Sequence, residues 1–332
     1  MTNKKDYILV TGSAGFIGFH LVSKLASRNC NVIGIDNLNN YYDIGLKKKR
    51  LKELEKIYKK KKKKLIFKKV NISKKNELFR IFKKYHITKI IHLAAQAGVR
   101  YSFKNPRVYA ESNLIGFFNI LEACRINNVK NLIFASSSSV YGNNNKFPFN
   151  EKDIYNTPLQ FYSSTKLSNE IMAYSYSKLY NINIIGLRFF TVYGPWGRPD
   201  MAYFSFSKKI LKNQIIDIFN HGKHFRDFTY IDDIIRGILL SIFKKPKKNY
   251  QIFNLAYGKP TKLMDLVKYL EKNLNKKAKL NFLGKQKGDM YKTYASISSF
   301  KKTYGYNPKI EISEGIKKFS NWYLNFINEK SL

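Results

Sequence analysis

Tyr162 and Lys166 are spaced so that they could act together on a proton. Residues four positions apart share one face of a helix, so the Lys166 ammonium would stand beside the Tyr162 phenol. A free phenol has a pKa of about 10, and an adjacent cation favours its ionised form. The pair could therefore act as a general base near neutral pH. Taken alone, this spacing also arises by chance on surface helices.

A run of four serines at 136–139 could hold the group that loses the proton. The run follows an expected buried strand, so its hydroxyls should emerge at the carboxyl edge of a sheet. Ser137 lies 25 residues before Tyr162, and we expect it to bind a substrate hydroxyl for proton exchange with that tyrosine. Asn113 is a candidate polar link between a helix backbone and this site, with a satisfied buried Asn as the alternative.

A glycine loop predicts a dinucleotide site. The apolar run YILVT at 7–11 leads directly into GSAGFIG at 12–18 and then into an expected helix. Gly12 would allow a tight turn, Gly15 the approach of a pyrophosphate, and Gly18 close packing of helix on strand. The helix that begins at Phe16 and Ile17 would direct its free N–H groups at the phosphates, which makes both residues cofactor-binding candidates.

Asp36 supports the same interpretation from the end of the next expected strand, eighteen residues after Gly18. A carboxylate at this position accepts hydrogen bonds from an adenosine ribose and repels a 2′-phosphate, which favours NAD over NADP. Asn37 follows it and is a further cofactor-binding candidate. The alternative is a glycine-rich turn beside a strand-end Asp that has no ligand.

In the first half of the chain, β-branched runs alternate with amphipathic stretches, a pattern typical of a parallel sheet with helices on both faces. We expect strands at 7–11, 31–36, 65–70, 89–93, 131–135 and 183–187, and helices at 16–27, 106–126 and 162–180. The predicted fold is a doubly wound α/β (Rossmann) domain at 1–190, followed by a smaller mixed substrate-binding domain at 191–332. A segment near 227–256 could return to the first domain.

The charge of the chain favours nucleic-acid binding at first sight. Its 332 residues carry 61 Lys and Arg against 22 Asp and Glu, a formal net charge of +39. Most of the excess is Lys and accompanies abundant Asn, Ile, Tyr and Phe, all with A/T-rich codons. We therefore favour an AT-biased genome over polyanion or anionic-membrane binding, and we expect no nucleic-acid partner and no stable membrane insertion.

Two cysteines without metal-ligand spacing and a start without an apolar signal segment make the cytoplasm the expected location. No metal site is expected.

Together, these residues resemble the extended short-chain dehydrogenase/reductase superfamily, and within it the NAD-dependent nucleotide-sugar epimerases. The resemblance spans nearly the whole chain. Three blocks are most similar to UDP-glucuronate 4-epimerases: AAQAGVRYS at 94–102, RFFTVYGPWGRPDM at 188–201 and RDFTYIDD at 226–233. Such blocks are far more specific than a glycine loop.

The resemblance implies a retained NAD⁺ that takes the C4 hydride of a UDP-sugar while Tyr162 removes the proton of the C4 hydroxyl. The 4-keto sugar then turns and receives the hydride on its other face, so no net oxidation results. Lys166 would bind the nicotinamide ribose and tune Tyr162, and Ser137 would hold O4. Arg226 would pair with the diphosphate through its guanidinium fork, and Arg100 is a further substrate-binding candidate.

The sugar is indicated by four residues that the resemblance places around a C6 carboxylate: Ser138, Ser139, Thr191 and Arg198. UDP-galactose epimerases usually carry Asn at the position of Thr191. The related 4,6-dehydratases have an Asp-Glu pair in the serine loop and the UDP-glucuronate decarboxylases a Glu, where this chain has two serines. Arg198 could instead form a salt bridge within its loop.

One departure affects the adenine end of the cofactor site. Relatives commonly carry an Asp after the third strand, where this chain has Asn71 and Ile72. Asn can still donate and accept hydrogen bonds, so both remain cofactor-binding candidates.

The leading hypothesis is a UDP-glucuronate 4-epimerase. The helices near 106–126 and 162–180 resemble those that pair in the dimers of relatives, so we expect a homodimer, with burial inside one subunit as the alternative. A UDP-glucose/UDP-galactose-type 4-epimerase is the nearest alternative. A non-catalytic NAD- or RNA-binding module on this fold is a more distant one.

Overall fold

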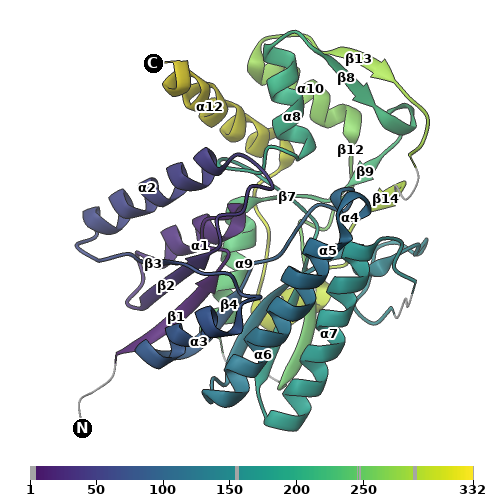
Figure 1. Ribbon diagram of the computed structural model, residues 1–332. Coiled ribbons are helices and arrows are strands. Elements are labelled where there is room, and N and C mark those ends of the chain that lie inside the picture. The colour runs from purple at the N-terminus through teal and green to yellow at the C-terminus, as the bar shows by residue number, and fades with distance from the viewer. Residues whose placement is uncertain (1–4, 154–156, 245, 247, 287–289, 332) are drawn as a thin grey trace. The chain divides into compact units, whose positions relative to one another are not determined.

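The computed structural model describes residues 5–153, 157–244, 246, 248–286 and 290–331. The chain forms two compact units, each built from separate segments (Figure 1). The first unit comprises Met1–Gly142, Tyr155–Arg188 and Ile238–Phe253. The second comprises Asn143–Ile154, Phe189–Gly237 and Asn254–Leu332.

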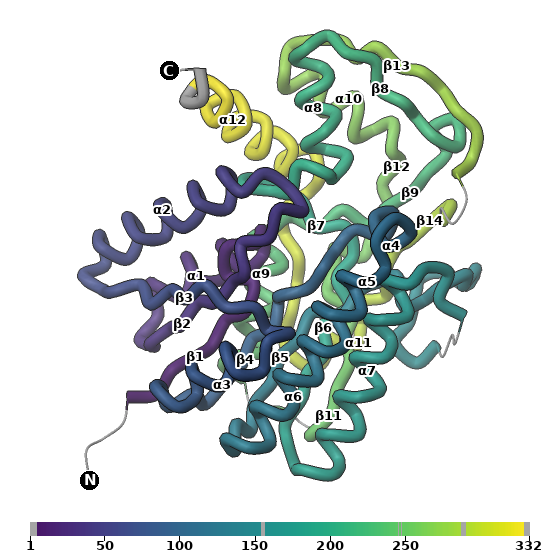
Figure 2. Tube along the Cα trace, viewed as in Figure 1, coloured from purple at the N-terminus to yellow at the C-terminus, as the bar shows by residue number. Residues whose placement is uncertain are grey.

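A seven-stranded sheet forms the centre of the first unit, in the order β11, β6, β5, β4, β1, β2, β3. Figure 2 shows β11 at one end of this sheet, although it comes late in the chain. The strands are β1 (Asp6–Thr11), β2 (Asn31–Asp36), β3 (Ile66–Lys69), β4 (His86–His92), β5 (Asn131–Ser137), β6 (Asn183–Phe189) and β11 (Tyr250–Leu255). β1 pairs in parallel with β2 and β4, β2 with β3, and β4 with β5. The expected doubly wound parallel sheet is confirmed.

The helices of the first unit are α1 (Phe16–Leu25), α2 (Ile44–Lys60), α3 (Lys75–Lys84), α4 (Tyr101–Lys104), α5 (Pro106–Tyr109), α6 (Gly116–Ile126), the short 3-10 helix η2 (Ser138–Tyr141) and α7 (Phe161–Tyr180). The apolar faces of α3, α6 and α7 form one core with the sheet, represented by Leu78, Phe117 and Ala173 against Leu9 and Ile33. Burial of this apolar surface is the main force that holds helices on the sheet.

The strand order reverses at β1, whose neighbours are β2 on one side and β4 on the other. In doubly wound folds, ligands bind beyond the carboxyl ends of the strands at this switch point. The last residues of β1, β2, β4 and β5 are Thr11, Asp36, His92 and Ser137, so these four side chains belong to the functional edge of the sheet.

The helix expected over 106–126 is confirmed, because the chain is helical from Pro106 to Ile126. It consists of α5, a π-helical segment η1 (Ala110–Ile115) and α6 in direct succession. A π-helical turn inserts an extra residue and is frequent at functional sites. Here it contains Asn113, whose side chain bonds to the backbone of Gln96 at both ends of its amide.

The second unit contains small sheets and helices. Its strands are β7 (Thr191–Tyr193), β8 (Ile215–Ile218), β9 (Phe225–Arg226), β10 (Phe228–Tyr230), β12 (Thr261–Lys262), β13 (Lys279–Phe282) and β14 (Lys292–Thr293). Its helices are α8 (Ala202–Leu211), η3 (Phe219–Gly222), α10 (Leu263–Leu274), α11 (Ser298–Tyr304) and α12 (Ile312–Ser331), while α9 (Ile231–Phe243) has residues in both units. Tyr203 packs edge-on against Phe319, with ring centroids 4.8 Å apart, inside an aromatic core. No helix in the described part of the chain is long and apolar enough to cross a membrane.

Candidate active site

The glycine loop between β1 and α1 packs so closely against neighbouring backbone that it has no space for side chains. Gly12 has φ +70°, and a Cβ there would lie 2.8 Å from the backbone nitrogen of Ala94. A Cβ on Gly18 would lie 2.0 Å from the carbonyl oxygen of Gly12. Gly15 is the N-cap of α1, so the first N–H groups of that helix open toward the loop. This cradle fits a pyrophosphate held by backbone N–H groups.

Asp36 is nearly buried at the end of β2, beside the same loop. Its carboxylate accepts hydrogen bonds from the backbone nitrogens of Ala14 (3.2 Å) and Leu38 (2.8 Å). These two bonds hold a negative charge where an adenosine ribose would donate its hydroxyls, and the charge disfavours a phosphate there. The arrangement of loop and carboxylate therefore fits NAD.

The other cofactor candidates follow β2 and β3. Asn37 accepts a hydrogen bond from Asn39, and Asn71 accepts two from Ser73, so both side-chain carbonyls shape their own turns. Ile72 is buried, and a Cβ on Gly116 would lie 2.8 Å from its Cδ1.

Lys166 is buried in the second turn of α7, where its Nζ donates a hydrogen bond of 2.8 Å to the carbonyl of Ala135. Burial lowers the pKa of this ammonium from 10.5 to about 8, and the negative charge of Glu170 opposes that change. Tyr162 lies in the first turn of α7 on the same helix face, and its ring meets the Tyr109 ring edge-on at 6.0 Å.

Ser137 ends β5, two residues after the carbonyl that binds Lys166. Its Oγ accepts hydrogen bonds from the nitrogen (3.2 Å) and the hydroxyl (3.0 Å) of Ser139, so it caps η2. The structure thus brings Ser137 to the strand end to which Lys166 is bonded. An oxygen held in this way can still donate its own proton to a substrate.

His92, at the end of β4, is a site group that the sequence reasoning missed. Thr11 accepts a hydrogen bond from the nitrogen of Ala94 (3.1 Å), and its hydroxyl lies 2.9 Å from Nδ1 of His92. Burial, and secondarily the charge of Lys166, lower the pKa of His92 to about 3. A neutral imidazole therefore lies at the functional edge. Its position at the end of a parallel strand was the available signal.

Asn113 joins three parts of the first unit. Its amide accepts from the nitrogen of Gln96 (2.8 Å) and donates to the carbonyl of Gln96 (3.1 Å) and to the Thr165 hydroxyl (3.1 Å). Thr165 in turn donates to the carbonyl of Tyr162 at 2.8 Å. The π-helical segment is therefore bonded to the turn of α7 that carries Tyr162.

The remaining substrate candidates are distributed over both units. Arg100 is exposed at the N-cap of α4, and Ser138 and Ser139 lie in η2. In the second unit, Arg198 forms a bidentate ion pair with Asp200, Nε to Oδ1 at 3.0 Å and Nη2 to Oδ2 at 2.5 Å. The loop salt bridge considered for Arg198 is therefore present in this structure.

Thr191 and Arg226 lie on separate small strands of the second unit, and both adjoin Asp227: Arg226 precedes it in the chain, and Thr191 is bonded to its backbone. The nitrogen of Thr191 donates to the Asp227 carbonyl at 3.0 Å. Arg226 donates from Nη1 to the carbonyls of Phe225 (2.8 Å) and Tyr291 (3.3 Å). Asp227 itself is buried and accepts from Thr229 and three backbone nitrogens, and burial raises its pKa to about 6.

Known proteins resemble this chain over most of its length. The model of the NAD dependent epimerase/dehydratase family matches residues 8–256. The chain is 52% identical to an uncharacterized protein of Methanocaldococcus jannaschii over 97% of both chains. It is 44% identical to UDP-glucuronate 4-epimerase 4 of Arabidopsis thaliana, over 98% of this chain and 77% of that protein.

A solved structure gives the same picture. The UDP-glucuronic acid 4-epimerase of Bacillus cereus, in complex with UDP-glucuronic acid and NAD, is 34% identical and has a TM-score of 0.88 to this chain. The match covers 96% of this chain and 99% of that one.

Proposed function

Because the chain belongs to the NAD-dependent epimerase/dehydratase family, we propose that it is a UDP-glucuronate 4-epimerase. It interconverts UDP-glucuronate and UDP-galacturonate through a 4-keto intermediate. A bound NAD⁺, held by the glycine loop and Asp36, would supply a reversible hydride acceptor for C4, so that no net oxidation would result.

One observation carries this proposal: the buried Lys166 ammonium is bonded to the end of β5, which also bears Ser137, and lies one helical turn from Tyr162. An acid-base phenol, a cation to favour its ionised form and a hydroxyl to hold the substrate are the groups that oxidation of a secondary alcohol requires.

Each residue then has a stated task. Tyr162 takes the proton of the C4 hydroxyl on its phenol oxygen and later gives it back to O4. Ser137 holds O4 during both transfers. Lys166 favours the phenolate and binds the nicotinamide ribose, while the glycine loop and Asp36 hold the rest of the dinucleotide, with Phe16, Ile17, Asn37, Asn71 and Ile72 around it.

We propose that the uronate is selected by Arg198, with Thr191, Ser138 and Ser139 as hydrogen-bond donors to the C6 carboxylate. A planar guanidinium is suited to a carboxylate, and binding of the uronate would require Arg198 to share or exchange its present ion pair with Asp200. Arg226 and Arg100 are proposed to bind the diphosphate.

The substrate assignment is tested by NMR of purified protein incubated with NAD⁺ and either UDP-glucuronate or UDP-glucose. Inversion at C4 of UDP-glucuronate is the expected result. Conversion of UDP-glucose alone would overturn the carboxylate assignment and leave a neutral-sugar 4-epimerase. Salt-dependent RNA binding without turnover would favour the non-catalytic alternative.

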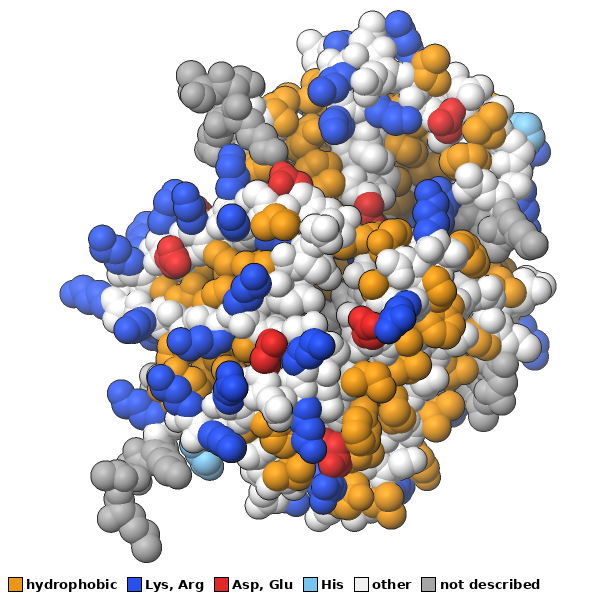
Figure 3. Space-filling model, viewed as in Figure 1, with side chains coloured by type: hydrophobic (Ala, Val, Ile, Leu, Met, Phe, Trp, Pro, Cys, Tyr) orange, Lys and Arg blue, Asp and Glu red, His pale blue; other side chains and the backbone are white. Residues whose placement is uncertain are grey.

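We also propose a homodimer that pairs through α6 and α7. Large apolar side chains are exposed along η1, α6 and α7: Ile115, Phe118, Ile126, Ile171, Tyr174 and Leu179. Figure 3 shows apolar side chains gathered over this part of the molecule, whereas Lys and Arg side chains gather over α2. A contiguous exposed apolar face is typical of a protein interface. Sedimentation of the wild type as a dimer and of Phe118→Glu as a monomer is the expected outcome.

We propose a cytoplasmic location because the two cysteines are not joined in a disulfide. Cys30 and Cys124 are both free, as expected for a reducing compartment.

A further inference from the structure

A buried carboxylate lies one helical turn beyond Lys166, outside the groups that the proposed chemistry uses. Glu170 accepts two hydrogen bonds from the Arg188 guanidinium of β6, from Nε at 2.9 Å and from Nη2 at 2.7 Å. Its Oε1 also accepts a hydrogen bond of 2.5 Å from the hydroxyl of Ser136. The pair is almost entirely excluded from water, with side chains 9% and 6% exposed. Removing either partner of such a pair would leave an uncompensated buried charge, which is costly.

This cluster attaches α7 to the end of β5 at a second point. Lys166 bonds to the carbonyl of Ala135, Glu170 bonds to the side chain of Ser136, and the next residue along the strand is Ser137. Ala135 and Ser136 are consecutive on the strand, and their partners are four positions apart on one face of the helix. The two bonds together therefore determine how the strand end is aligned with the helix.

Neighbouring elements support the cluster on its other sides. The Arg188 guanidinium lies over the Tyr141 ring of η2 at 4.7 Å. The hydroxyl of Tyr250 in β11 donates to the backbone carbonyl of Glu170 at 2.8 Å. The carboxylate is thus held by β5, β6 and α7 and indirectly by η2, the segment that begins at Ser138.

The charges around Lys166 come from several elements. Glu170 on its own helix attracts the ammonium, and His92 on β4 is neutral. Tyr162 precedes Lys166 on α7, Tyr109 on α5 meets the Tyr162 ring, and Arg188 on β6 is paired with Glu170. Glu170 is therefore the negative charge that opposes loss of the Lys166 proton, and it is itself ion-paired with Arg188.

We propose that Ser136, Glu170 and Arg188 are positioning residues for the epimerase, which hold Ser137 in place and keep Lys166 charged without touching the substrate. This inference rests on the proposed function for its kinetic consequences. Its structural consequence, the coupling of Glu170 to Lys166, is independent of which substrate is used.

Ser136→Ala tests the positioning role, because it deletes only the bond between the ion pair and β5. We expect kcat to fall about tenfold or more, since small displacements of reacting groups are costly, with KM and NAD affinity changed less than about twofold. Ser207→Ala is the matched control, because Ser207 is equally buried and donates to a backbone carbonyl in the second unit. Equal kcat in wild type and Ser136→Ala would overturn the positioning role.

Glu170→Gln tests the charge, because it keeps the shape of the side chain. Loss of the carboxylate should lower the pKa of Lys166, so kcat should decline with rising pH about one pH unit earlier than in the wild type. Glu122→Gln is the control, since Glu122 is also paired with an arginine, Arg125, and also accepts from a hydroxyl, that of Tyr176. The same alkaline limb in all three proteins would contradict the proposal.

A second readout avoids turnover altogether. The fraction of Lys166 that is deprotonated is measured at a series of pH values. Trace acetic anhydride acetylates the neutral amine, and mass spectrometry of the α7 peptide gives the extent of acetylation. A lower midpoint in Glu170→Gln, but not in Ser136→Ala or Glu122→Gln, is expected. If the wild type inverted no UDP-sugar, the proposed function would fail while this measurement still decided the coupling. An unchanged midpoint in an active enzyme would refute the inference alone.

Discussion

The ammonium of Lys166 donates a hydrogen bond to the backbone carbonyl of Ala135 at 2.8 Å, although the two residues are 31 positions apart in the chain. Ala135 precedes Ser137 by two residues on β5. This bond, together with that between Ser136 and Glu170, links the helix that carries Tyr162 to the strand that carries the proposed O4-binding hydroxyl. This link is the basis for the predictions that follow.

Tyr162→Phe should lower kcat by roughly a hundredfold or more, because it removes the acid-base oxygen and keeps the ring. NAD affinity, measured by calorimetry, should stay within about twofold of the wild type. Tyr174→Phe, on the exposed side of the same helix, is the control and should retain full activity. Wild-type turnover in Tyr162→Phe would exclude this tyrosine as the proton carrier.

Lys166→Met should abolish turnover and yet increase the free energy of unfolding of the NAD-free protein at pH 7, by on the order of 2 kcal/mol. The pKa of Lys166 is about 8 in the folded protein against an ordinary value of 10.5. Between these values the unfolded chain binds the extra proton, so the stability of the wild type rises as pH rises through this window. Below pH 8 the full cost of burying the charge remains.

The advantage of Lys166→Met should therefore shrink from pH 8 to pH 10. Chemical denaturation at a series of pH values measures it. A constant difference between the two proteins over this range would show that Lys166 stays charged when buried.

Gly18→Ala should prevent NAD binding or lower it by more than tenfold, because the added Cβ would collide with the backbone of Gly12 and push α1 away from β1. Gly284→Ala is a matched control, since a Cβ there meets nothing within 4 Å. Calorimetry with NAD⁺ and circular dichroism would separate loss of binding from loss of fold. Normal NAD affinity in Gly18→Ala would show that the loop can relax.

Much of the fold could be predicted from hydrophobic pattern and glycine placement. The strands were found because buried parallel strands are continuous β-branched runs, and the glycine loop and Asp36 because strand, turn and helix signals coincide there. The helix over 106–126 was predicted because periodicity reports an apolar face. It does not report that Asn113 must reach Gln96, a tertiary bond that accompanies the π-helical turn.

The site was predictable only where spacing along the chain carries the chemistry. Tyr162 and Lys166 share a helix face, so four positions of spacing were enough. The Thr11 to His92 bond joins residues 81 positions apart, and the Ser136 to Glu170 bond joins residues 34 apart. Pairs of this kind depend on strand order, which local sequence does not contain. The roles of all the proposed site residues, Tyr162, Lys166 and Ser137 included, remain predictions.

Arg198→Met should lower kcat/KM for UDP-glucuronate by about tenfold or more. The reason is that a lost charged hydrogen bond to a carboxylate costs on the order of 2 kcal/mol. Any activity with UDP-glucose should change little. Arg107→Met is the control, since Arg107 also pairs with a carboxylate, that of Glu111, through Nε. Equal losses on both sugars would contradict a role in selecting the uronate.

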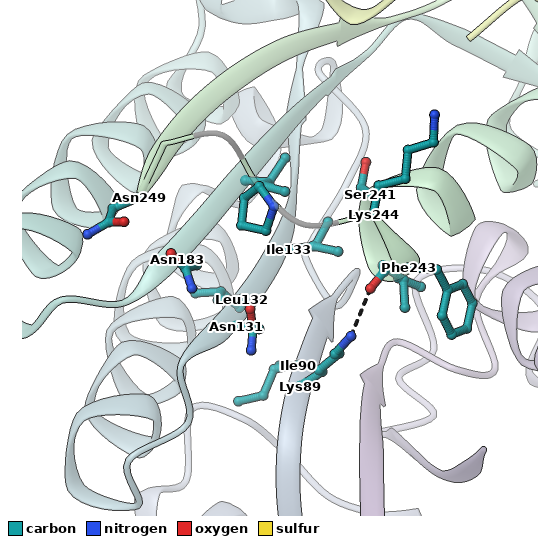
Figure 4. A pocket seen from close by; sticks show the side chains of 13 residues that line it. Lys89, Ile90, Asn131, Leu132, Ile133, Asn183, Ser241, Phe243, Lys244 and Asn249 are labelled. Atoms are coloured by element: carbon teal, nitrogen blue, oxygen red, sulfur yellow. Dashed lines mark hydrogen bonds between the residues drawn. The ribbon is translucent and has the colours of Figure 1, made fainter. Parts of the chain in front are cut away.

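None of the proposed site residues lines the pocket that Figure 4 shows. It has a volume of about 460 Å³ and is lined by the first residues of β5 and β6, by Lys89 and by the end of α9. The Lys89 ammonium donates to the carbonyl of Ile242 at 2.9 Å, so its charge stabilises the C-terminus of α9. The pocket therefore lies at the amino ends of these strands, at the edge of the sheet opposite Ser137.

In the proposed reaction, hydrogen leaves C4 of a UDP-uronate and returns to the same carbon on its other face. UDP-glucuronate deuterated at C4 tests it most directly, incubated with the NAD⁺-loaded enzyme in ordinary water and followed by NMR and mass spectrometry. The expected product is UDP-galacturonate that retains the deuterium at C4. Product in which the deuterium has been exchanged for solvent hydrogen, or substrate that is never inverted, would contradict it.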